Sequence, residues 1–273
     1  MTIFQAVILG IVQGLTEFLP ISSSGHLVIV PFLLQWKLQP EIVFSFDVLV
    51  QMGTLAAVIV YFWKDLIEIA VAFIRGLIER RPFDTYASRL GWYLILATIP
   101  ASLAGLLIKD AVEQAFHSPI ATACFLLVTA AILVLAEYLG KRQRPLQTMT
   151  WKDAVWVGCS QIASLFPGVS RSGATIAGGL LRNFNRADAG RFSFLMSIPV
   201  MVGAGGLSIL DLFDIPNLSS FLLPLLLGTL AAAVVGFLAI HWLLRYLTQH
   251  SLRVFALYCA IAGMITLVVA YVR

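Results

Sequence analysis

Residues 13–26 read Gln13-Gly-Leu-Thr-Glu17-Phe-Leu-Pro20-Ile-Ser22-Ser23-Ser24-Gly25-His26, and this stretch decides how the rest of the chain is interpreted. Apolar runs, Ile3 to Val12 and Leu27 to Leu34, lie on either side of it. Pro20 and Gly25 favour a break between the helices that these runs predict. A carboxylate, three hydroxyls and an imidazole are costly at membrane depth unless they have partners or water. That cost is the first indication of a functional site.

The composition excludes an ordinary soluble domain. Hydrophobic residues make up 60% and charged residues 12% of the 273 positions, whereas soluble domains have about 45–50% apolar and about 25% charged residues. Several windows reach the roughly 20 apolar residues that cross a bilayer. The sequence predicts one all-α, polytopic membrane domain over residues 1–273. Loop charges that set topology explain the net charge of +4, so no nucleic-acid partner is expected.

Six windows predict transmembrane helices, and two further windows predict something else. Windows 3–36 and 153–182 are apolar at both ends, but Pro, Gly and Ser interrupt each near its middle. Irregular backbone at membrane depth is tolerated only inside protein or beside a water-filled cavity. We therefore expect both windows to be re-entrant helix–loop–helix hairpins. The six predicted spans are residues 44–63, 91–109, 119–139, 191–210, 219–244 and 254–272.

The basic residues support this count. They cluster after the first span, after the third span, after the second hairpin and between the last two spans. Six crossings with two re-entrant hairpins place all four clusters on the cytoplasmic side, as basic loops prefer. Both termini then lie outside, the first hairpin enters from outside and the second enters from the cytoplasm.

An internal repeat relates the two hairpins. A shift of 148 residues superposes Gln13 on Gln161 and Ser22-x-Ser24-Gly25 on Ser170-x-Ser172-Gly173. The halves 1–140 and 150–273 each hold one hairpin and three crossings, and this odd number inverts the second half. Paired broken helices in an inverted repeat are a known way to build a site at the midplane. We expect the two bends to meet there.

The predicted meeting point suits an anion. A Ser/Gly loop that opens a helix offers backbone N–H groups to an anion, and Arg171 adds a guanidinium suited to phosphate oxygens. Gln13 and Glu17 are four residues apart and share a helix face. That face could hold a divalent cation, which completes its shell with substrate phosphate and water, or position a base toward the serines.

Structural roles are the alternatives. The serines at 22–24 are also good helix N-caps, and Glu17 with Arg171 could form an intramembrane ion pair. A lone His26 would usually be an interior histidine, but its grouping with ionisable neighbours favours a function. Asp47 and Gln51 either support the site or line its entrance.

Residues 13–26 and Pro167-Gly-Val-Ser170-Arg171-Ser-Gly173 closely resemble the motifs of the undecaprenyl-pyrophosphate phosphatase (bacitracin-resistance protein) family. The resemblance covers essentially the whole chain. It implies a hydrolase of the bacterial cell membrane whose substrate is a polyprenyl pyrophosphate lipid. Such an enzyme removes the terminal phosphate of undecaprenyl pyrophosphate and returns the lipid monophosphate that carries cell-wall precursors. The family also implies an active site open to the extracytoplasmic side.

By this resemblance the catalytic residues are Glu17, Ser23, His26 and Arg171. Gln13 and Glu17 fall on the acidic motif, to which we assign a Mg²⁺ or Ca²⁺ ion. The first position of that motif often carries Glu; Gln13 can ligate a metal or hydrogen-bond phosphate but cannot act as a base. The remaining substrate-binding candidates are Ser22, Ser24, Gly25, Ser170, Ser172 and Gly173.

Three questions stay open at the level of sequence. Ser23 is expected to attack with Glu17 or His26 as base, but direct attack by His26 or by water fits the same residues. A transporter or flippase for a prenyl-phosphate lipid or a small anion also fits the inverted repeat, although transport needs no nucleophile beside a base. Small-residue stretches at 203–206 and 228–236 permit either a homodimer or close packing within one chain.

Overall fold

The computed structural model describes residues 1–36, 38, 40–116, 118–211 and 218–272, and helices account for almost all of these. The all-α fold class is therefore confirmed. Arg273 and most of the predicted connection between spans 191–210 and 219–244 lie outside the described residues. In chain order the elements are α1 (Ile3–Phe18), α2 (Ser23–Leu33), α3 (Pro40–Tyr61), α4 (Trp63–Ile78), α5 (Tyr86–Leu107), α6 (Lys109–Phe116), α7 (Pro119–Leu139), η1 (Leu146–Thr148), α8 (Trp151–Ser160), η2 (Gln161–Leu165), α9 (Arg171–Leu181), α10 (Arg186–Asp211), α11 (Leu218–Gln249) and α12 (Arg253–Val272).

The first predicted break separates α1 from α2. Leu19 leaves the helix in an extended conformation, and Pro20 has no N–H with which to continue it. Ser22 has a φ of 72°, in the left-handed region that few residues other than glycine adopt. Its hydroxyl accepts a hydrogen bond of 3.2 Å from the N–H of Gly25 and so caps α2.

The second break repeats this arrangement between α8 and α9. Gly168 turns the chain with a φ of +103°, and a Cβ there would lie 2.3 Å from the carbonyl oxygen of Thr122. The hydroxyl of Ser170 accepts a hydrogen bond of 3.0 Å from Gly173 and caps α9. Helices α2 and α9 both have 11 residues and start 148 positions apart, at Ser23 and Arg171.

The two bends touch one another. The N–H of Gly168 donates a hydrogen bond of 3.1 Å to the hydroxyl of Ser22, and the hydroxyl of Ser172 donates one of 2.9 Å to the carbonyl of Leu19. A Cβ on Gly25 would lie 3.0 Å from the Cα of Gly168. Each hydrogen bond joins a backbone group of one bend to a serine hydroxyl of the other, and together with the close approach of the two glycines these bonds fix the bends relative to each other.

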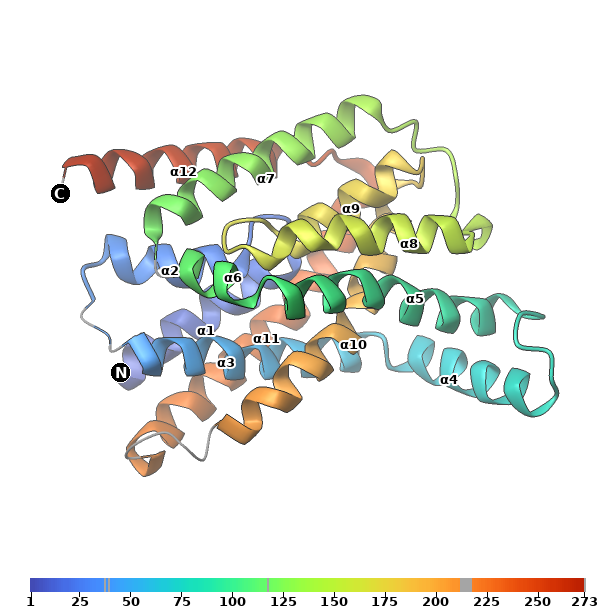
Figure 1. The fold of residues 1–273 in the computed structure, drawn as a ribbon, viewed down its shortest axis with the longest axis horizontal. Helices are drawn as coiled ribbons and strands as arrows, with labels where there is room; N and C mark the ends of the chain where they lie inside the picture. The colour runs from blue at the N-terminus through green and yellow to red at the C-terminus, as the bar shows by residue number, and fades with distance from the viewer. Residues whose placement is uncertain (37, 39, 117, 212–217, 273) are drawn as a thin grey trace.

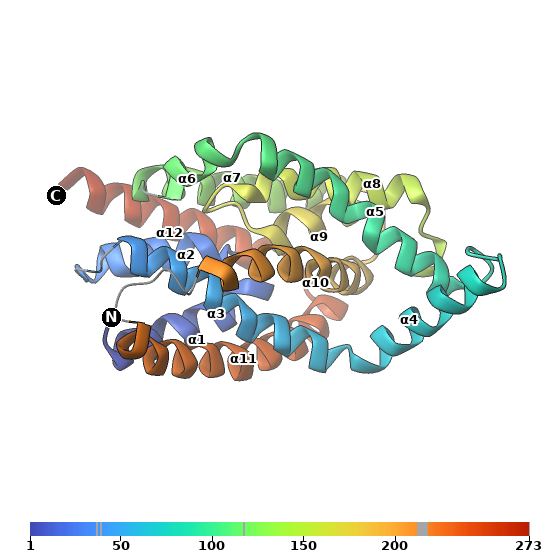
Figure 2. The ribbon, with the colours of Figure 1, turned by 60° about the horizontal axis from the view of Figure 1, so that its bottom comes forward.

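Helix α11 packs closely against α1 and α3 (Figures 1 and 2). A Cβ on Gly10 would lie 2.1 Å from the carbonyl oxygen of Gly228. Gly236, at the other end of the small-residue stretch 228–236, faces Thr54, Phe18 and Ala57. This stretch is thus used for packing within one chain. For the stretch 203–206, the structure does not describe all of the side chains.

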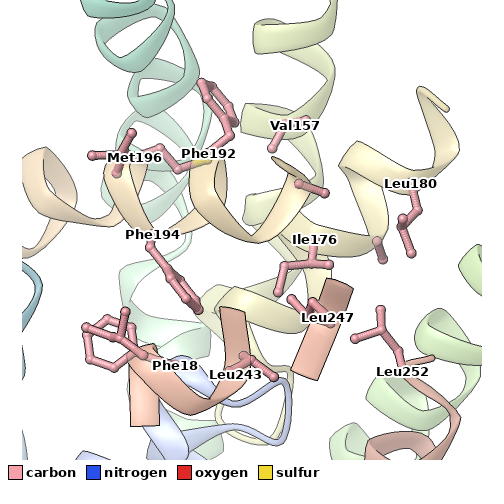
Figure 3. Close-up of a cluster of buried hydrophobic side chains, with 14 of the residues drawn as sticks. Phe18, Val157, Ile176, Leu180, Phe192, Phe194, Met196, Leu243, Leu247 and Leu252 are labelled. Carbon is pink, nitrogen blue, oxygen red and sulfur yellow. The ribbon is translucent and has the colours of Figure 1, made fainter. Parts of the chain in front are cut away.

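The largest hydrophobic cluster lies among the second hairpin, α10 and α11 (Figure 3). Phe18 of α1 and Phe194 of α10 meet edge to face with their ring centroids 5.2 Å apart, and both are fully buried. Ile176 of α9 and Leu243 of α11 complete the same core. Between helices that lie in lipid, such packing stabilises the fold through close van der Waals contact rather than through removal of apolar surface from water, and it holds the hairpins against the long helices.

Two buried carboxylates join the basic connections at one end of the molecule. Glu137 accepts hydrogen bonds from Arg142, from Arg186 and from the N–H of Leu252. Asp153 accepts hydrogen bonds from two arginines, Arg144 and Arg182. Three of the four predicted basic clusters are thereby gathered at one end, and the N-terminus and the C-terminal end of α12 lie at the opposite end (Figure 1).

Each of the six predicted spans coincides with a helix, and four helices of the described part are long and apolar enough to cross a membrane. These four are Tyr86–Leu107, Pro119–Leu139, Phe221–Gln249 and Arg253–Val272. Two helices were not predicted. Helix α4 pairs with α5 and extends beyond the rest of the molecule (Figure 2), and α6 precedes α7.

Candidate active site

A cavity of about 570 Å³ lies where the two bends meet. Its wall combines the bends with parts of α3, α5, α6 and α10. The polar part of the wall brings together residues from both halves of the chain: Glu17, Ser22, Ser23, Ser24, Gln51, Ser102, Gln161, Ser164, Ser170 and Arg171.

Glu17 is the centre of the polar contacts. Its Oε2 accepts a hydrogen bond of 2.5 Å from the Ser23 hydroxyl and one of 2.9 Å from Nε2 of Gln13. Its Oε1 accepts a hydrogen bond of 3.1 Å from Nη2 of Arg171. The residue is only 7% exposed. The carboxylate is therefore aligned on the Ser23 hydroxyl and held there by two further donors, Gln13 and Arg171.

Arg171 reaches Glu17 from the other half of the chain. It is the first residue of α9, and its side chain is 14% exposed. Nη1 donates a hydrogen bond of 3.3 Å to the carbonyl of Ser193. A guanidinium has five N–H donors, so donors remain for an anion in the cavity.

The other residues of the two Ser/Gly motifs divide into wall and support. Ser22, Ser24 and Ser170 belong to the cavity wall, whereas Gly25, Ser172 and Gly173 do not. Ser172 is fully buried, and its hydroxyl donates a hydrogen bond to the carbonyl of Leu19. The two glycines donate their N–H groups to the capping serines. These three residues hold the bends together beside the cavity, and their expected contact with the substrate stays a prediction.

Gln13 lies behind Glu17 rather than in the cavity wall. It is fully buried, and its Nε2 approaches both Glu17 and the hydroxyl of Thr54. Its Oε1 has no hydrogen-bond partner. Gln13 thus orients the carboxylate, and its expected contact with metal or phosphate stays a prediction.

His26 does not belong to the cavity wall either. Its Nδ1 lies 2.7 Å from the carbonyl oxygen of Ser22, so this nitrogen carries the ring proton and donates a hydrogen bond to that carbonyl. Its Nε2 lies 2.7 Å from the hydroxyl of Tyr258 on α12, whose ring stacks on the imidazole. The structure therefore brings Glu17, Ser23 and Arg171 together but places His26 behind the first bend. No motif or spacing in the sequence indicates a role for Tyr258.

Asp47 and Gln51 differ in their positions. Gln51 lines the cavity, as one of its two expected roles requires. Asp47 is 7% exposed, lies outside the wall, and its Oδ1 has no partner.

The donor set suits a hard cation that arrives with its ligand. Among the described residues no three His, Cys, Asp or Glu side chains form a cluster that could hold a metal. The cavity wall offers one carboxylate, several hydroxyls and two amides, all of which carry oxygen donors. Mg²⁺ commonly binds through one or two carboxylates and completes its shell with substrate phosphates and water. The residues present therefore fit a cation that binds together with a phosphate.

Comparison with known proteins identifies the relatives of this chain. The family model of bacitracin resistance protein BacA matches residues 6–265. A protein of Thermomicrobium roseum named undecaprenyl-diphosphatase is 44% identical over 276 residues, which cover 98% of each chain. Proteins of the same name from Chlorobium phaeovibrioides and Myxococcus xanthus are 44% and 42% identical over 98% of this chain, and the matches cover 96% and 89% of their own lengths.

Proposed function

Because the chain belongs to the bacitracin resistance protein BacA family, we propose that it is an undecaprenyl-diphosphatase. It hydrolyses undecaprenyl pyrophosphate to undecaprenyl phosphate and inorganic phosphate, and so returns the carrier lipid to cell-wall synthesis. The observation that carries this proposal is the contact of Ser23 and Arg171 with the two oxygens of Glu17. A nucleophile, its base and a phosphate-binding cation are thereby assembled in one cavity.

In the first step, Glu17 takes the proton of the Ser23 hydroxyl as Oγ attacks the terminal phosphorus. The bond from that phosphorus to the bridging oxygen breaks, and the lipid monophosphate leaves with the electron pair. The negative charge spread over the phosphoryl oxygens is the main demand of phosphoryl transfer. Arg171, next to Glu17, meets that demand with its free N–H donors.

In the second step, water hydrolyses the phosphoserine. Glu17, having passed its first proton to the departing lipid monophosphate, accepts a proton from the attacking water and gives that proton to Ser23 Oγ as inorganic phosphate leaves. The short Ser23–Glu17 contact favours Glu17 over His26 as the first base. A part for His26 in the second step would require its ring to leave Tyr258; attack by His26 or by water remains the alternative to Ser23.

A divalent cation, Mg²⁺ or Ca²⁺, belongs to this proposal. Glu17 would hold it together with phosphate oxygens and water, with Gln13 supporting the carboxylate from behind. Such an ion, when bound, neutralises phosphate charge and polarises the phosphoryl oxygens.

The cavity has a polar part and an apolar part, which suit the diphosphate and the prenyl chain of the substrate. Its polar wall lies at the bends, and the rest of its wall is largely apolar, with Ala101, Leu106, Leu165, Val200 and Met201. The diphosphate would occupy the polar part, and the first isoprene units would lie along the apolar part. The remaining chain would stay in lipid, against surfaces such as the apolar outer face of α12.

We further propose six crossings with two re-entrant hairpins in an inverted repeat, both termini outside, and a cavity open to the extracytoplasmic side of the cell membrane. The matched caps of α2 and α9 support the repeat, and the gathering of basic connections at one end supports the topology. A homodimer stays a prediction. Transport loses support, because it does not need a hydroxyl hydrogen-bonded to a buried carboxylate.

The testing experiment is phosphate release from farnesyl or undecaprenyl pyrophosphate by the purified protein in detergent. We expect release by the unchanged chain, and a loss of about 100-fold or more in Ser23→Ala and in Arg171→Ala. Arg75→Ala is the matched control, since Arg75 lies in an exposed pair with Glu79 on α4. Full activity in both site variants would overturn the assignment of the site.

A further inference from the structure

Gln161 is a buried amide without a partner. The residue is 2% exposed, and neither its Nε2 nor its Oε1 has a hydrogen-bond partner. Burying an unpaired polar group usually costs about 1–3 kcal/mol, so native structures keep few of them. Several other buried polar atoms of the described residues also lack partners, but Gln161 alone among these residues belongs to the cavity wall.

The break between α8 and η2 places Gln161 in that wall. Helix α8 ends at Ser160, and Gln161 is the first residue of η2. The hydroxyl of Ser164 donates a hydrogen bond of 2.7 Å to the carbonyl of Gln161 and so holds the backbone of this turn. Arg171, Ser170 and Ser164 contribute to the same wall. Gln161 therefore forms part of the cavity wall on the side of the second bend.

The internal repeat explains why this amide has no partner. Gln161 corresponds to Gln13, whose Nε2 donates a hydrogen bond to Glu17, four residues later in the chain. The position four residues after Gln161 is Leu165, which offers no acceptor. The second half thus keeps the amide but lacks the carboxylate.

We infer that Gln161 binds the diphosphate of the substrate, with Nε2 donating to a phosphate oxygen beside Arg171. This inference rests on the proposed function. An anion in the cavity supplies the acceptor that the fold omits, and the neutral amide adds a directional donor without a further charge. Gln161 then contributes to holding the diphosphate, whereas the proton transfers belong to Glu17.

The test combines kinetics, binding and stability of Gln161→Leu in the full-length purified protein. We expect KM for farnesyl pyrophosphate to rise about tenfold or more, as for the loss of a hydrogen bond to a charged group, with a smaller change in kcat. Affinity for a non-hydrolysable farnesyl methylenediphosphonate should fall by the same factor. The ligand-free variant should melt at or above the temperature of the unchanged protein, because an unsatisfied buried amide has been replaced by an apolar side chain.

Two further variants keep the inference falsifiable. The side chain of Gln161→Glu has the same shape, and this variant should bind the diphosphonate still more weakly because a carboxylate repels phosphate. It replaces Gln161→Leu in the binding test if the leucine variant does not accumulate. Trp92→Phe removes another unpartnered buried N–H, outside the cavity wall, and should leave both KM and affinity unchanged. Unchanged affinity in Gln161→Leu and Gln161→Glu, or a marked fall in the melting temperature of Gln161→Leu without ligand, would overturn the inference. Absence of phosphate release from the unchanged protein would instead overturn the proposed function.

Discussion

The hydroxyl of Ser23 donates a hydrogen bond of 2.5 Å to the carboxylate of Glu17, across the bend that separates α1 from α2. The two residues are six positions apart. The extended turn at Leu19 and the left-handed Ser22 bring them face to face. The same carboxylate accepts a hydrogen bond from Arg171 of the second bend. One acidic side chain therefore connects the two halves of the chain at the cavity.

Replacing this acid should stop the chemistry. Glu17→Gln keeps the size of the side chain but cannot accept a proton, so we expect kcat to fall by about 10²–10⁴-fold, the usual contribution of a general base. Phosphate release from farnesyl pyrophosphate measures it, and Glu68→Gln, an exposed acid on α4, is the control. A loss of less than about fivefold would place the base elsewhere.

A second prediction separates support from proton transfer at His26. Nδ1 of this ring donates to the carbonyl of Ser22, and the amide of an asparagine can make the same hydrogen bond. We expect His26→Asn to keep most of the activity and His26→Leu to lose it, because only the leucine releases the bend. Equal inactivity of the two variants in the phosphate-release assay would show that the imidazole itself takes part in the reaction.

The buried carboxylate Asp153 should stabilise the fold in a pH-dependent way. Burial raises the pKa of Asp153, but hydrogen bonds from Arg144, Arg182 and Thr150 outweigh this effect and lower the pKa from 3.8 to about 2. A lowered folded-state pKa contributes stability that is complete above about pH 4 and lost as the pH falls through about 2. The shift corresponds to about 2 kcal/mol.

Asp153→Asn should therefore lower the melting temperature in detergent at pH 7, and the difference from the unchanged protein should disappear toward pH 2. Arg75→Ala should change stability by less than about 0.5 kcal/mol, because its ion pair is exposed. A difference for Asp153→Asn that does not depend on pH below 4 would contradict this account.

Removal of divalent cations is the fourth prediction. Exhaustive chelation should slow phosphate release by about tenfold or more, because a bound cation stabilises transition-state charge by several kcal/mol. Added Mg²⁺ or Ca²⁺ should restore the rate. Full activity in the chelated protein would leave charge neutralisation to Arg171 and the helix N-termini alone.

The meeting of the bends could be predicted from sequence for physical reasons that are local. Pro20 cannot continue α1, Ser22 and Ser170 are good caps, and the matched spacing of the motifs implied that Glu17 and Arg171 approach one another. These features depend on residue types within a few positions of each other. The shift of 148 residues that relates the hairpins also pairs Gln161 with Gln13.

The orientation of His26 and the existence of α4 could not be predicted in the same way. The direction of the His26 ring depends on Tyr258, which is 232 positions away, and no local pattern encodes that contact. The charges of the segment that forms α4 predict a basic connection rather than a helix. The exposed apolar residues of α4, Ile67, Val71 and Ile74, recur at helical spacing, which is typical of an amphipathic helix.

The most direct test of the account is the identity of the phosphorylated residue. The protein is mixed with farnesyl pyrophosphate labelled in the terminal phosphate, quenched within the first turnover in neutral denaturant, and digested. We predict label on the peptide that contains Ser23, and none on that peptide in Ser23→Ala. Label on His26, or phosphate release with no labelled peptide at all, would contradict Ser23 as the nucleophile.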